Sequence, residues 1–418
     1  MHGNGSATDV LSDDDVASIL ARGLHDVALD GKRVLVIVPD STRHAPIPLM
    51  FRLLHELLQG RVAELAYLVA LGTHPPMDED AIDALVGVPA AQRAERYPGI
   101  RIANHSWDDP SALVRLGAVP ADDVSAATGG LLHADVPVVL NRMLLDADHV
   151  VICGPVFPHE VAGFSGGAKY LFPGIAGPQI IDATHWLGAL VTSSATIGVK
   201  DTPVRRLIHR AAELVPRPIT CIAMAVTGHE LHGVFVGDHI EAWSAAADLA
   251  GELGITTVPR PFHRVLSMPS PIYDDLWTAA KAMYKTEPAI AEGGEVVIYA
   301  PHLREISYTH GAAIDAVGYH VRDYFTLQPG RFDDVPGMIK AHSTHVKGLG
   351  SYDPATHVET PRITVTLATG IPESRCRAVN LGYLDHRTID PDEWEGREDE
   401  GVLVVHNAGE MLYRAGPA

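Results

Sequence analysis

The stretch KRVLVIVPD at residues 32–40 decides the fold class of this chain. It is a short run of β-branched and other apolar residues that ends in Pro-Asp, a pattern typical of a buried parallel strand. The periodic segment IPLMFRLLHELLQG at 47–60 follows it and predicts an amphipathic helix closed by Gly60. A buried strand followed by such a helix predicts an α/β fold with a parallel sheet.

The same pattern recurs along the first 260 residues. AELAYLVALGTH at 63–74 and DHVVICGPV at 148–156 each predict a strand, and TCIAMAVTG, GVFVGD and EAWSAAADLAGELG continue the pattern through residue 254. Polar residues follow three of these strands, namely Asp40 with Arg43, His74 and His159. Because ligands of open α/β sheets bind outside the carboxyl ends of the strands, we expect these residues on one rim.

A second domain is predicted to begin near residue 263. It has a strand around Val265, a helix through LWTAAKAMYKTEPAIAEG at 276–293, and strands in GEVVIYAP, RITVTLATG and GVLVVHNAG. We therefore expect two α/β domains, 1–262 and 263–418, with Rossmann-like parallel or mixed sheets flanked by helices. The last strand or helix is free to return to the N-terminal domain. An active site in the cleft between the domains, where closure excludes water, is the expected geometry.

Composition excludes several classes of protein. The 418 residues include 32 basic and 52 acidic ones, a net charge of −20, which argues against a nucleic-acid surface. Cys153, Cys221 and Cys376 are widely spaced, so neither a disulfide framework nor a thiolate metal site is expected, and a reducing cytoplasm fits best. The polar, acidic N-terminus lacks a signal-peptide pattern, and no apolar run approaches the roughly 20 residues of a membrane span.

The run HEVAGFSGGAKYLFPGIAGPQIIDATH at 159–185 carries the most chemistry. Its Gly-Gly turn can direct backbone N–H groups toward an anion, and Lys169 follows directly. This lysine can neutralise a phosphate or, once desolvated, act as a nucleophile, while His159 and His185 can carry protons or bind a metal. GFSGGAK differs from the GxxxxGK[ST] phosphate loop in its spacing and lacks the terminal hydroxyl.

This segment closely resembles the signature of the nickel-pincer-dependent lactate racemase family. Further matches occur in the expected order, at PDSTR (39–43), ALGTH (70–74), DATHW (182–186), and AAKAM followed by EGG in the second half. Several spaced motifs in order are far more specific than any single one of them. The resemblance therefore extends over most of the chain.

The resemblance implies a cofactor and a role for each matching residue. Lys169 would carry, through a thioamide, the nickel-pincer nucleotide, a pyridinium-3-thioamide-5-thiocarboxylic acid mononucleotide with nickel, and His185 would ligate the nickel. His74 and His159 would exchange protons with the substrate hydroxyl. The residues expected to line the nucleotide are Asp40, Arg43, Ser165, Gly166 and Gly167, and those expected to bind substrate are Arg43, Thr278 and Lys281.

The activity implied by the resemblance is racemisation or C2-epimerisation of a 2-hydroxy acid. Removal of the Cα hydrogen as hydride avoids a carbanion beside a carboxylate, and a histidine on each side explains why two are needed. The expected partners are a small 2-hydroxy acid and the enzymes that make the cofactor, and a homo-oligomer is left open.

Three departures from the family pattern leave the substrate open. Pro75 stands where arginine is frequent, Thr278 where the lactate enzyme has glutamine, and KAHSTHVKG at 340–348 has no close counterpart there. His342 and His345 in that stretch could hold extra hydroxyl groups on a longer acid. An aldonate 2-epimerase is therefore the alternative within the same mechanism, and a non-catalytic relative that holds the nucleotide or nickel is the alternative from another class.

Most of these residues also have simple structural interpretations. Asp40 can cap the following helix, a lysine on a helix such as Lys281 is most often solvated, and a histidine within an apparent helix, such as His185, is most often buried and hydrogen-bonded. The pair His342 and His345 has metal-ligand spacing but no convincing third ligand nearby, so a separate zinc site is not expected.

Overall fold

The computed structural model describes residues 1–42 and 44–416. Its contacts group the chain into two compact units. Unit 1 comprises Met1–Phe157, Phe164–Thr184 and Lys200–Leu253, and unit 2 comprises Pro158–Gly163, His185–Val199 and Gly254–Ala418. The expected boundary between residues 262 and 263 falls just inside the long last segment of unit 2, whereas local sequence patterns do not predict its two short segments.

Unit 1 is built on a seven-stranded sheet with the order β1-β11-β10-β7-β2-β3-β4. Strands β10, β7, β2, β3 and β4 are parallel to one another, and β11 and β1 are each antiparallel to their neighbours. The strands are β1 (His2–Gly5), β2 (Arg33–Val38), β3 (Glu64–Val69), β4 (Arg101–Asn104), β7 (His149–Val156), β10 (Ile219–Thr227) and β11 (Glu230–Gly237).

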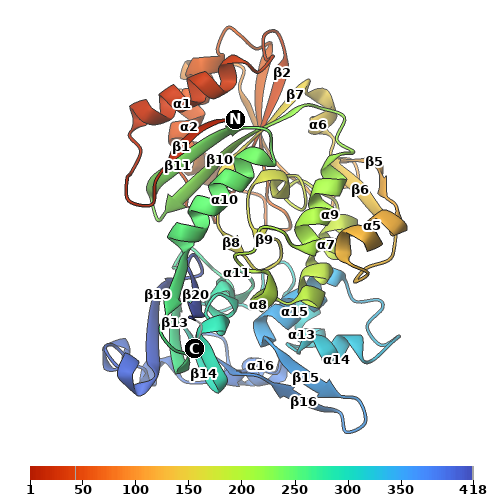
Figure 1. The fold of residues 1–418 in the computed structure, drawn as a ribbon, viewed down its shortest axis with the longest axis vertical. Coiled ribbons are helices and arrows are strands. Elements are labelled where there is room, and N and C mark those ends of the chain that lie inside the picture. The colour runs from red at the N-terminus through yellow and green to blue at the C-terminus, as the bar shows by residue number, and fades with distance from the viewer. Residues whose placement is uncertain (43, 417–418) are drawn as a thin grey trace. The chain divides into compact units, whose positions relative to one another are not determined.

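One face of this sheet packs against helices α1 (Asp13–His25), α2 (Ile47–Leu58) and α3 (Glu79–Val86), which share a single apolar core with the strands. Figure 1 shows α1 and α2 side by side along the sheet. Ser12 starts α1 through a capping box with Asp15. The apolar periodicity of 47–60 thus predicts α2 correctly, since its buried residues are those that face the sheet.

The remaining elements of unit 1 are shorter. Strands β5 (Leu113–Val119) and β6 (Val136–Asn141) form an antiparallel hairpin. The other helices are α4 (Ala90–Arg96), α5 (Ala121–Thr128), α6 (Met143–Asp146), α9 (Pro203–Ala212) and α10 (Glu241–Gly254), with the single 3-10 turn η1 at Gly167–Tyr170. Helix α7 (Pro178–Val191) begins in unit 1 and ends in unit 2.

The carboxyl edge of the unit 1 sheet is where the sequence places its polar residues. Strand β2 lies between β3 and β7, and the chain winds outward from it in both directions. This is the switch point at which open α/β sheets bind their ligands. The loops that follow β2, β3 and β7 therefore leave the sheet side by side.

Unit 2 contains a parallel five-stranded sheet with the order β18-β17-β14-β13-β19. These strands are β13 (Phe262–Pro269), β14 (Ile290–Ala300), β17 (Thr364–Thr369), β18 (Gly382–Tyr383) and β19 (Val402–Ala408). Strand β13 has β14 on one side and β19 on the other, so unit 2 has a switch point of its own. The prediction of Rossmann-like parallel and mixed sheets with helices on them is confirmed.

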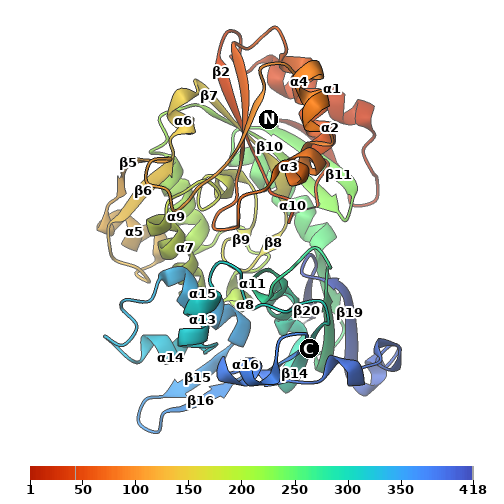
Figure 2. The same ribbon diagram turned by 180° about the vertical axis from the view of Figure 1, so that it is seen from behind.

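Smaller elements complete unit 2. Figure 2 shows α13 (Gly311–Val317), α14 (Arg322–Thr326) and α15 (Gly337–Lys347) gathered beside the hairpin of β15 (Gly350–Asp353) and β16 (Val358–Pro361). Two short strands, β12 (Ile255–Val258) and β20 (Leu412–Ala415), pair in parallel. The others are α8 (Ser193–Thr196), α16 (Glu373–Ala378), the short β8–β9 pair (Pro158–His159, Gly163–Phe164), and 3-10 turns at His386–Thr388, Pro391–Glu393 and Glu398–Glu400.

The predicted helix over 276–293 is wrong in its length. The segment forms two single turns, α11 (Leu276–Ala279) and α12 (Lys281–Tyr284), then the 3-10 turn η2 (Glu287–Ala289), and β14 already begins at Ile290. Pro288 cannot donate to a helical carbonyl, and the Thr286 hydroxyl donates to the carbonyl of Ala282 at 2.8 Å. Both features end the helix early. In the part of the chain that the structure describes, no helix is long and apolar enough to cross a membrane.

The packing of α2 predicts how a cavity in the unit 1 core changes the free energy of unfolding. Leu54 is fully buried in the unit 1 core. We expect Leu54→Ala to lower the free energy of unfolding by about 2–5 kcal/mol, because it removes apolar contacts and leaves a cavity. Urea-induced unfolding followed by circular dichroism measures this. Glu56→Ala, at an exposed position of the same helix, should change it by no more than about 0.5 kcal/mol, and equal effects of the two variants would contradict the packing.

Candidate active site

His74 and Asp40, which follow adjacent strands, lie in contact. His74 Nδ1 is 2.5 Å from Asp40 Oδ2, while Asp40 Oδ1 accepts from the backbone N–H and the hydroxyl of Thr42. Asp40 is buried and the His74 side chain is one quarter exposed. A carboxylate only accepts hydrogen bonds, so this contact favours the Nδ1–H tautomer of His74 and makes Nε2 the nitrogen that accepts a proton.

The SGG turn before Lys169 is shaped by its two glycines. Gly166 and Gly167 have φ of +77° and +58°, a region that side chains disfavour. A Cβ on Gly166 would lie 2.6 Å from Val156 Cγ2, and one on Gly167 would lie 2.8 Å from Trp243 Cβ. Both positions therefore require glycine for backbone conformation and for close packing against β7 and α10.

Ser165 fastens the same turn to the end of β7. Its hydroxyl accepts from the backbone N–H of Phe157 at 2.8 Å and is 3.4 Å from the carbonyl oxygen of Pro155. The backbone N–H of Ser165 also donates to the carbonyl of Phe157 at 2.8 Å. These bonds show a structural task for Ser165, and its predicted contact with a nucleotide stays a prediction. Arg43 lies outside the described residues.

A buried arginine holds the turn from the other side. Arg205 on α9 is 1% exposed, and its guanidinium donates to the carbonyls of Phe164 and Gly166. Its Cζ also lies 4.1 Å from the centre of the Trp243 ring, and the Trp243 indole N–H donates to the carbonyl of Ser165 at 2.8 Å. Burial lowers the pKa of Arg205. Three consecutive carbonyls of the turn are thus bound by α9 and α10.

Lys169 lies on η1 directly after this turn and is half-buried. Its backbone N–H donates to the carbonyl of Gly166, and its own carbonyl accepts from Gly174. The backbone of the lysine is therefore fixed on both sides, while its side chain is neither fully buried nor fully exposed.

In unit 2, His159 begins the segment HEVAG and is buried. Its Nδ1 accepts from the backbone N–H of Val161 at 3.1 Å, and Glu160 Oε2 lies 3.4 Å from the same nitrogen. Because Nδ1 is the acceptor, the neutral ring carries its proton on Nε2. His74 and His159 are therefore held in opposite tautomers, one with an accepting and one with a donating Nε2.

Glu160 is the centre of a charged cluster in unit 2. Burial by itself raises the pKa of Glu160, but a backbone hydrogen bond and the charges of Lys281, His345 and Lys285 outweigh it and hold the pKa below its usual value. Lys281 is 8% exposed, with its Nζ 4.4 Å from the centre of the Tyr273 ring. A buried lysine beside a carboxylate is unlike the solvated lysine that a helical position alone would indicate.

His185 lies on α7, within electrostatic range of a group of histidines in unit 2. The pKa of His342 is lowered to about 3, chiefly by burial and also by the charges of His345, His310 and His185. The His342 ring stacks on Trp277 at 3.9 Å between centroids, and its Nε2 is 3.1 Å from the Trp277 carbonyl oxygen. Among residues 1–42 and 44–416, no three His, Cys, Asp or Glu side chains are grouped to hold a metal ion.

Thr278 takes part in capping α11. Its hydroxyl donates to Asp275 Oδ1 at 2.9 Å, and the same carboxylate accepts from the Thr278 backbone N–H at 3.0 Å. The side chain thus turns back toward the start of the helix. Its predicted role in substrate binding stays a prediction.

The sequence analysis did not single out three residues of these clusters, Glu160, Arg205 and Trp243. Glu160 is adjacent to His159 within the signature, so its position in the motif could have indicated that it belongs to the same cluster. Arg205 and Trp243 lie 36 and 74 residues beyond Lys169 in the sequence, and no local pattern marks them as neighbours of the turn.

Comparison with known proteins identifies the family. Residues 16–198 match a family model described as "Lactate racemase N-terminal domain". This segment therefore carries the N-terminal domain of that family. The match agrees with the resemblance carried by the motifs, and the relatives named lactate racemase indicate an enzyme of the isomerase class, a racemase.

Two curated relatives of this chain are both named lactate racemase. The protein of Thermoanaerobacterium thermosaccharolyticum is 24% identical over 71% of this chain and 67% of its own length. The protein of Lactiplantibacillus plantarum is 25% identical over 67% of this chain and 61% of its own length. These relatives support a racemase that acts on hydroxy acids.

Two solved structures resemble this chain over nearly its whole length. A crystal structure of a Thermotoga maritima protein is 31% identical and has a TM-score of 0.89, covering 99% of this chain and all of that one. The lactate racemase apoprotein of T. thermosaccharolyticum is 19% identical with a TM-score of 0.70, covering 97% of this chain and 93% of that one, and it confirms the fold.

The arginine beneath the turn generates a testable prediction. We expect Arg205→Met to speed amide exchange in residues 164–170 by at least about tenfold and to lower the free energy of unfolding by about 1–3 kcal/mol, because buried carbonyls lose their donors. Hydrogen exchange with mass spectrometry measures the first effect. The matched control is Arg206→Met, since Arg206 is the next residue of α9 and its side chain is 43% exposed. Unchanged exchange in Arg205→Met would contradict the proposed support of the turn.

Proposed function

We propose that this protein racemises or epimerises a 2-hydroxy acid at C2, with His74 and His159 as the two proton-transfer groups. The observation that carries the proposal is the opposite hydrogen bonding of the two rings. His74, bound to Asp40 through Nδ1, offers Nε2 as a base, and His159, accepting at Nδ1, offers an Nε2–H that can donate a hydrogen bond to the substrate oxygen. Inversion at a hydroxyl-bearing carbon needs one group of each kind.

Lys281 is the residue best suited to bind the substrate carboxylate. It is a buried cation whose neighbour Glu160 keeps its negative charge, so the lysine is stabilised in its charged form. Lys285, on the same stretch, already donates to the carbonyl of Glu410 at 2.9 Å. The predicted substrate role of Lys281 is supported by this local balance of charge.

The residues that would hold the nickel-pincer nucleotide fit the chemistry of that group. An amine such as that of Lys169 can form the thioamide, and its backbone is fixed by the turn that Arg205 supports. A single imidazole, His185, is sufficient as the protein's ligand, because the nucleotide itself carries the nickel. When bound, the cofactor supplies a centre that accepts a hydride and returns it.

The first test concerns attachment. We expect intact-protein mass spectrometry, after coexpression with the cofactor's biosynthetic enzymes, to show a covalent adduct on the wild-type chain and on Lys200→Ala, but not on Lys169→Ala. Lys200 is the control because its amine is bound to Asp248 at 2.7 Å on the surface of unit 1. An adduct that persists in Lys169→Ala would refute the assignment, and no adduct on any chain would favour a relative without turnover.

The second test concerns proton transfer. In the loaded enzyme, we expect His74→Gln and His159→Gln to lower kcat by about 10²–10⁴-fold, and Asp40→Asn to lower it by about 10–100-fold, because Asp40 orients His74. Chiral chromatography of lactate, malate, aryl-lactates and aldonates measures turnover. His133→Gln, at an exposed histidine, is the control.

Isotope labelling separates the proposed route from simple proton abstraction. A substrate turned over in D2O should invert without incorporating deuterium at C2, because hydride does not exchange with solvent. Incorporation of deuterium at C2 would contradict the hydride route.

The second candidate function is an aldonate 2-epimerase on the same mechanism. It is favoured by the short Thr278 at the position where the lactate enzyme has glutamine, and by the polar pocket described next. The substrate panel above discriminates between the two functions.

A further inference from the structure

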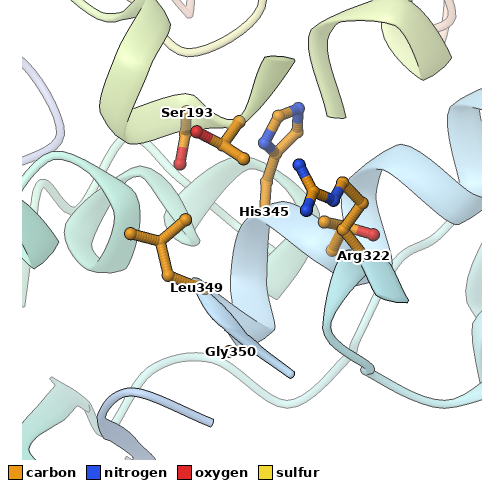
Figure 3. Close-up of a pocket in the computed structure, with 8 residues that line it drawn as sticks. Ser193, Arg322, His345, Leu349 and Gly350 are labelled. Atoms are coloured by element: carbon orange, nitrogen blue, oxygen red, sulfur yellow. The ribbon is translucent and has the colours of Figure 1, made fainter. Parts of the chain in front are cut away.

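Unit 2 contains a small pocket of about 40 Å³, lined in part by His345, for which the sequence suggested contact with extra hydroxyl groups of a longer acid. Figure 3 shows His345 and Arg322 beside each other in it, with Ser193 and Leu349 on the opposite wall. Thr344 also lines the pocket. The residues come from three separate elements, α8, α14 and α15, together with the loop that follows α15.

The polar groups of this pocket are not satisfied by the protein. His345 is 4% exposed, yet in the described part of the chain neither of its ring nitrogens has a hydrogen-bond partner, and the same holds for the hydroxyl of Thr344. A buried imidazole without partners costs stability, and such groups persist where a ligand supplies the missing bonds.

The charge of the pocket favours a neutral ligand group over an anion. Arg322 is paired with Asp323, whose Oδ1 lies 3.0 Å from Nη2, and it also donates to the carbonyl of Leu190. Burial lowers the pKa of His345 to about 4 against the opposing charge of Glu160, so the ring is neutral at pH 7. A neutral imidazole offers one donor and one acceptor.

A hydroxyl group matches the one donor and one acceptor of the neutral His345 ring, since a hydroxyl also donates and accepts. A carboxylate only accepts and would leave the accepting nitrogen of the ring unpaired. The Thr344 hydroxyl adds a further donor and acceptor beside it. Two adjacent groups of this kind suit a chain that carries several hydroxyls.

One residue of the pocket, His345, lies within electrostatic range of a glutamate that also interacts with the proposed carboxylate-binding lysine. Glu160 interacts electrostatically with both His345 and Lys281, and it is the neighbour of His159 in the chain. His345 and Lys281 therefore both lie within electrostatic range of the Glu160 carboxylate.

We propose that His345 and Thr344 form a subsite for hydroxyl groups beyond C2, so that the substrate is a polyhydroxylated 2-hydroxy acid. This inference rests on the proposed function, because C2 is the carbon at which the proposed reaction inverts the substrate. The subsite itself is a binding feature of unit 2 and can be tested without turnover.

The test is calorimetric titration of the full chain, without cofactor, using two probes of equal length. Gluconate carries hydroxyls on every carbon beyond C2, and 2-hydroxyhexanoate carries none. We expect the wild type to bind gluconate at least about tenfold more tightly, and His345→Phe to remove most of that difference, as the loss of one to two neutral hydrogen bonds predicts. His345→Gln, which keeps a donor and an acceptor, should retain part of it.

Controls guard against a folding defect. Thr344→Val, close in shape, should weaken gluconate alone, and His263→Phe, at an exposed histidine of unit 2, should change neither probe. The melting temperature of His345→Phe should not fall below that of the wild type, because no hydrogen bond within the protein is lost. A purely structural histidine would give a lower melting temperature and no selective effect.

The outcomes are distinguishable. Equal binding of the two probes, or equal weakening of both by His345→Phe and Thr344→Val, would mean that the pocket holds water only and would overturn the subsite. Selective binding lost in His345→Phe supports the subsite. Selective binding by a loaded enzyme that inverts neither acid would support the subsite and refute the proposed function.

Discussion

The segment that leads into Lys169, the lysine proposed to carry the cofactor, depends on a buried arginine whose partners are backbone carbonyls. Arg205 and the Trp243 on which it stacks bind three successive carbonyls of the segment that leads into Lys169. In the described residues, no acidic side chain forms an ion pair with this guanidinium. The desolvation of the charge is offset by dipoles of the backbone and by the ring face, so the turn and the arginine hold each other in place.

In unit 2, a single carboxylate interacts electrostatically with several neighbouring side chains. Glu160 is largely buried, and its pKa stays below the usual value because a backbone hydrogen bond and the nearby charges of Lys281 and Lys285 stabilise the carboxylate. A buried charge of this kind is tolerated only when it is paired, and part of that pairing comes from Lys281, at a depth where lysine is rarely found. The signature segment therefore contributes to the site through its glutamate as well as through its histidine.

Polar groups in the two units differ in how completely they are satisfied. Asp40, Ser165 and Thr278 each have several partners within the protein, which gives them structural tasks beside any chemical one. The ring of His345 has none in the part of the chain that the structure describes. Polar groups that a fold leaves without hydrogen-bond partners at a pocket lower its stability, and proteins keep such groups where they bind a ligand.

The sequence by itself determined the α/β class, the strands β2, β3, β7, β10 and β19, the helices α2 and α10, and the meeting of Asp40 with His74 at one sheet edge. These follow from local apolar runs and from the rule that parallel strands end together. Only the tertiary structure decided the division of the signature segment between two units, the early end of the helix after Tyr284, and the support of the turn by Arg205. It alone placed His345 in a pocket near Glu160. The physical reason is that burial and charge pairing depend on residues distant in sequence, which local periodicity does not record.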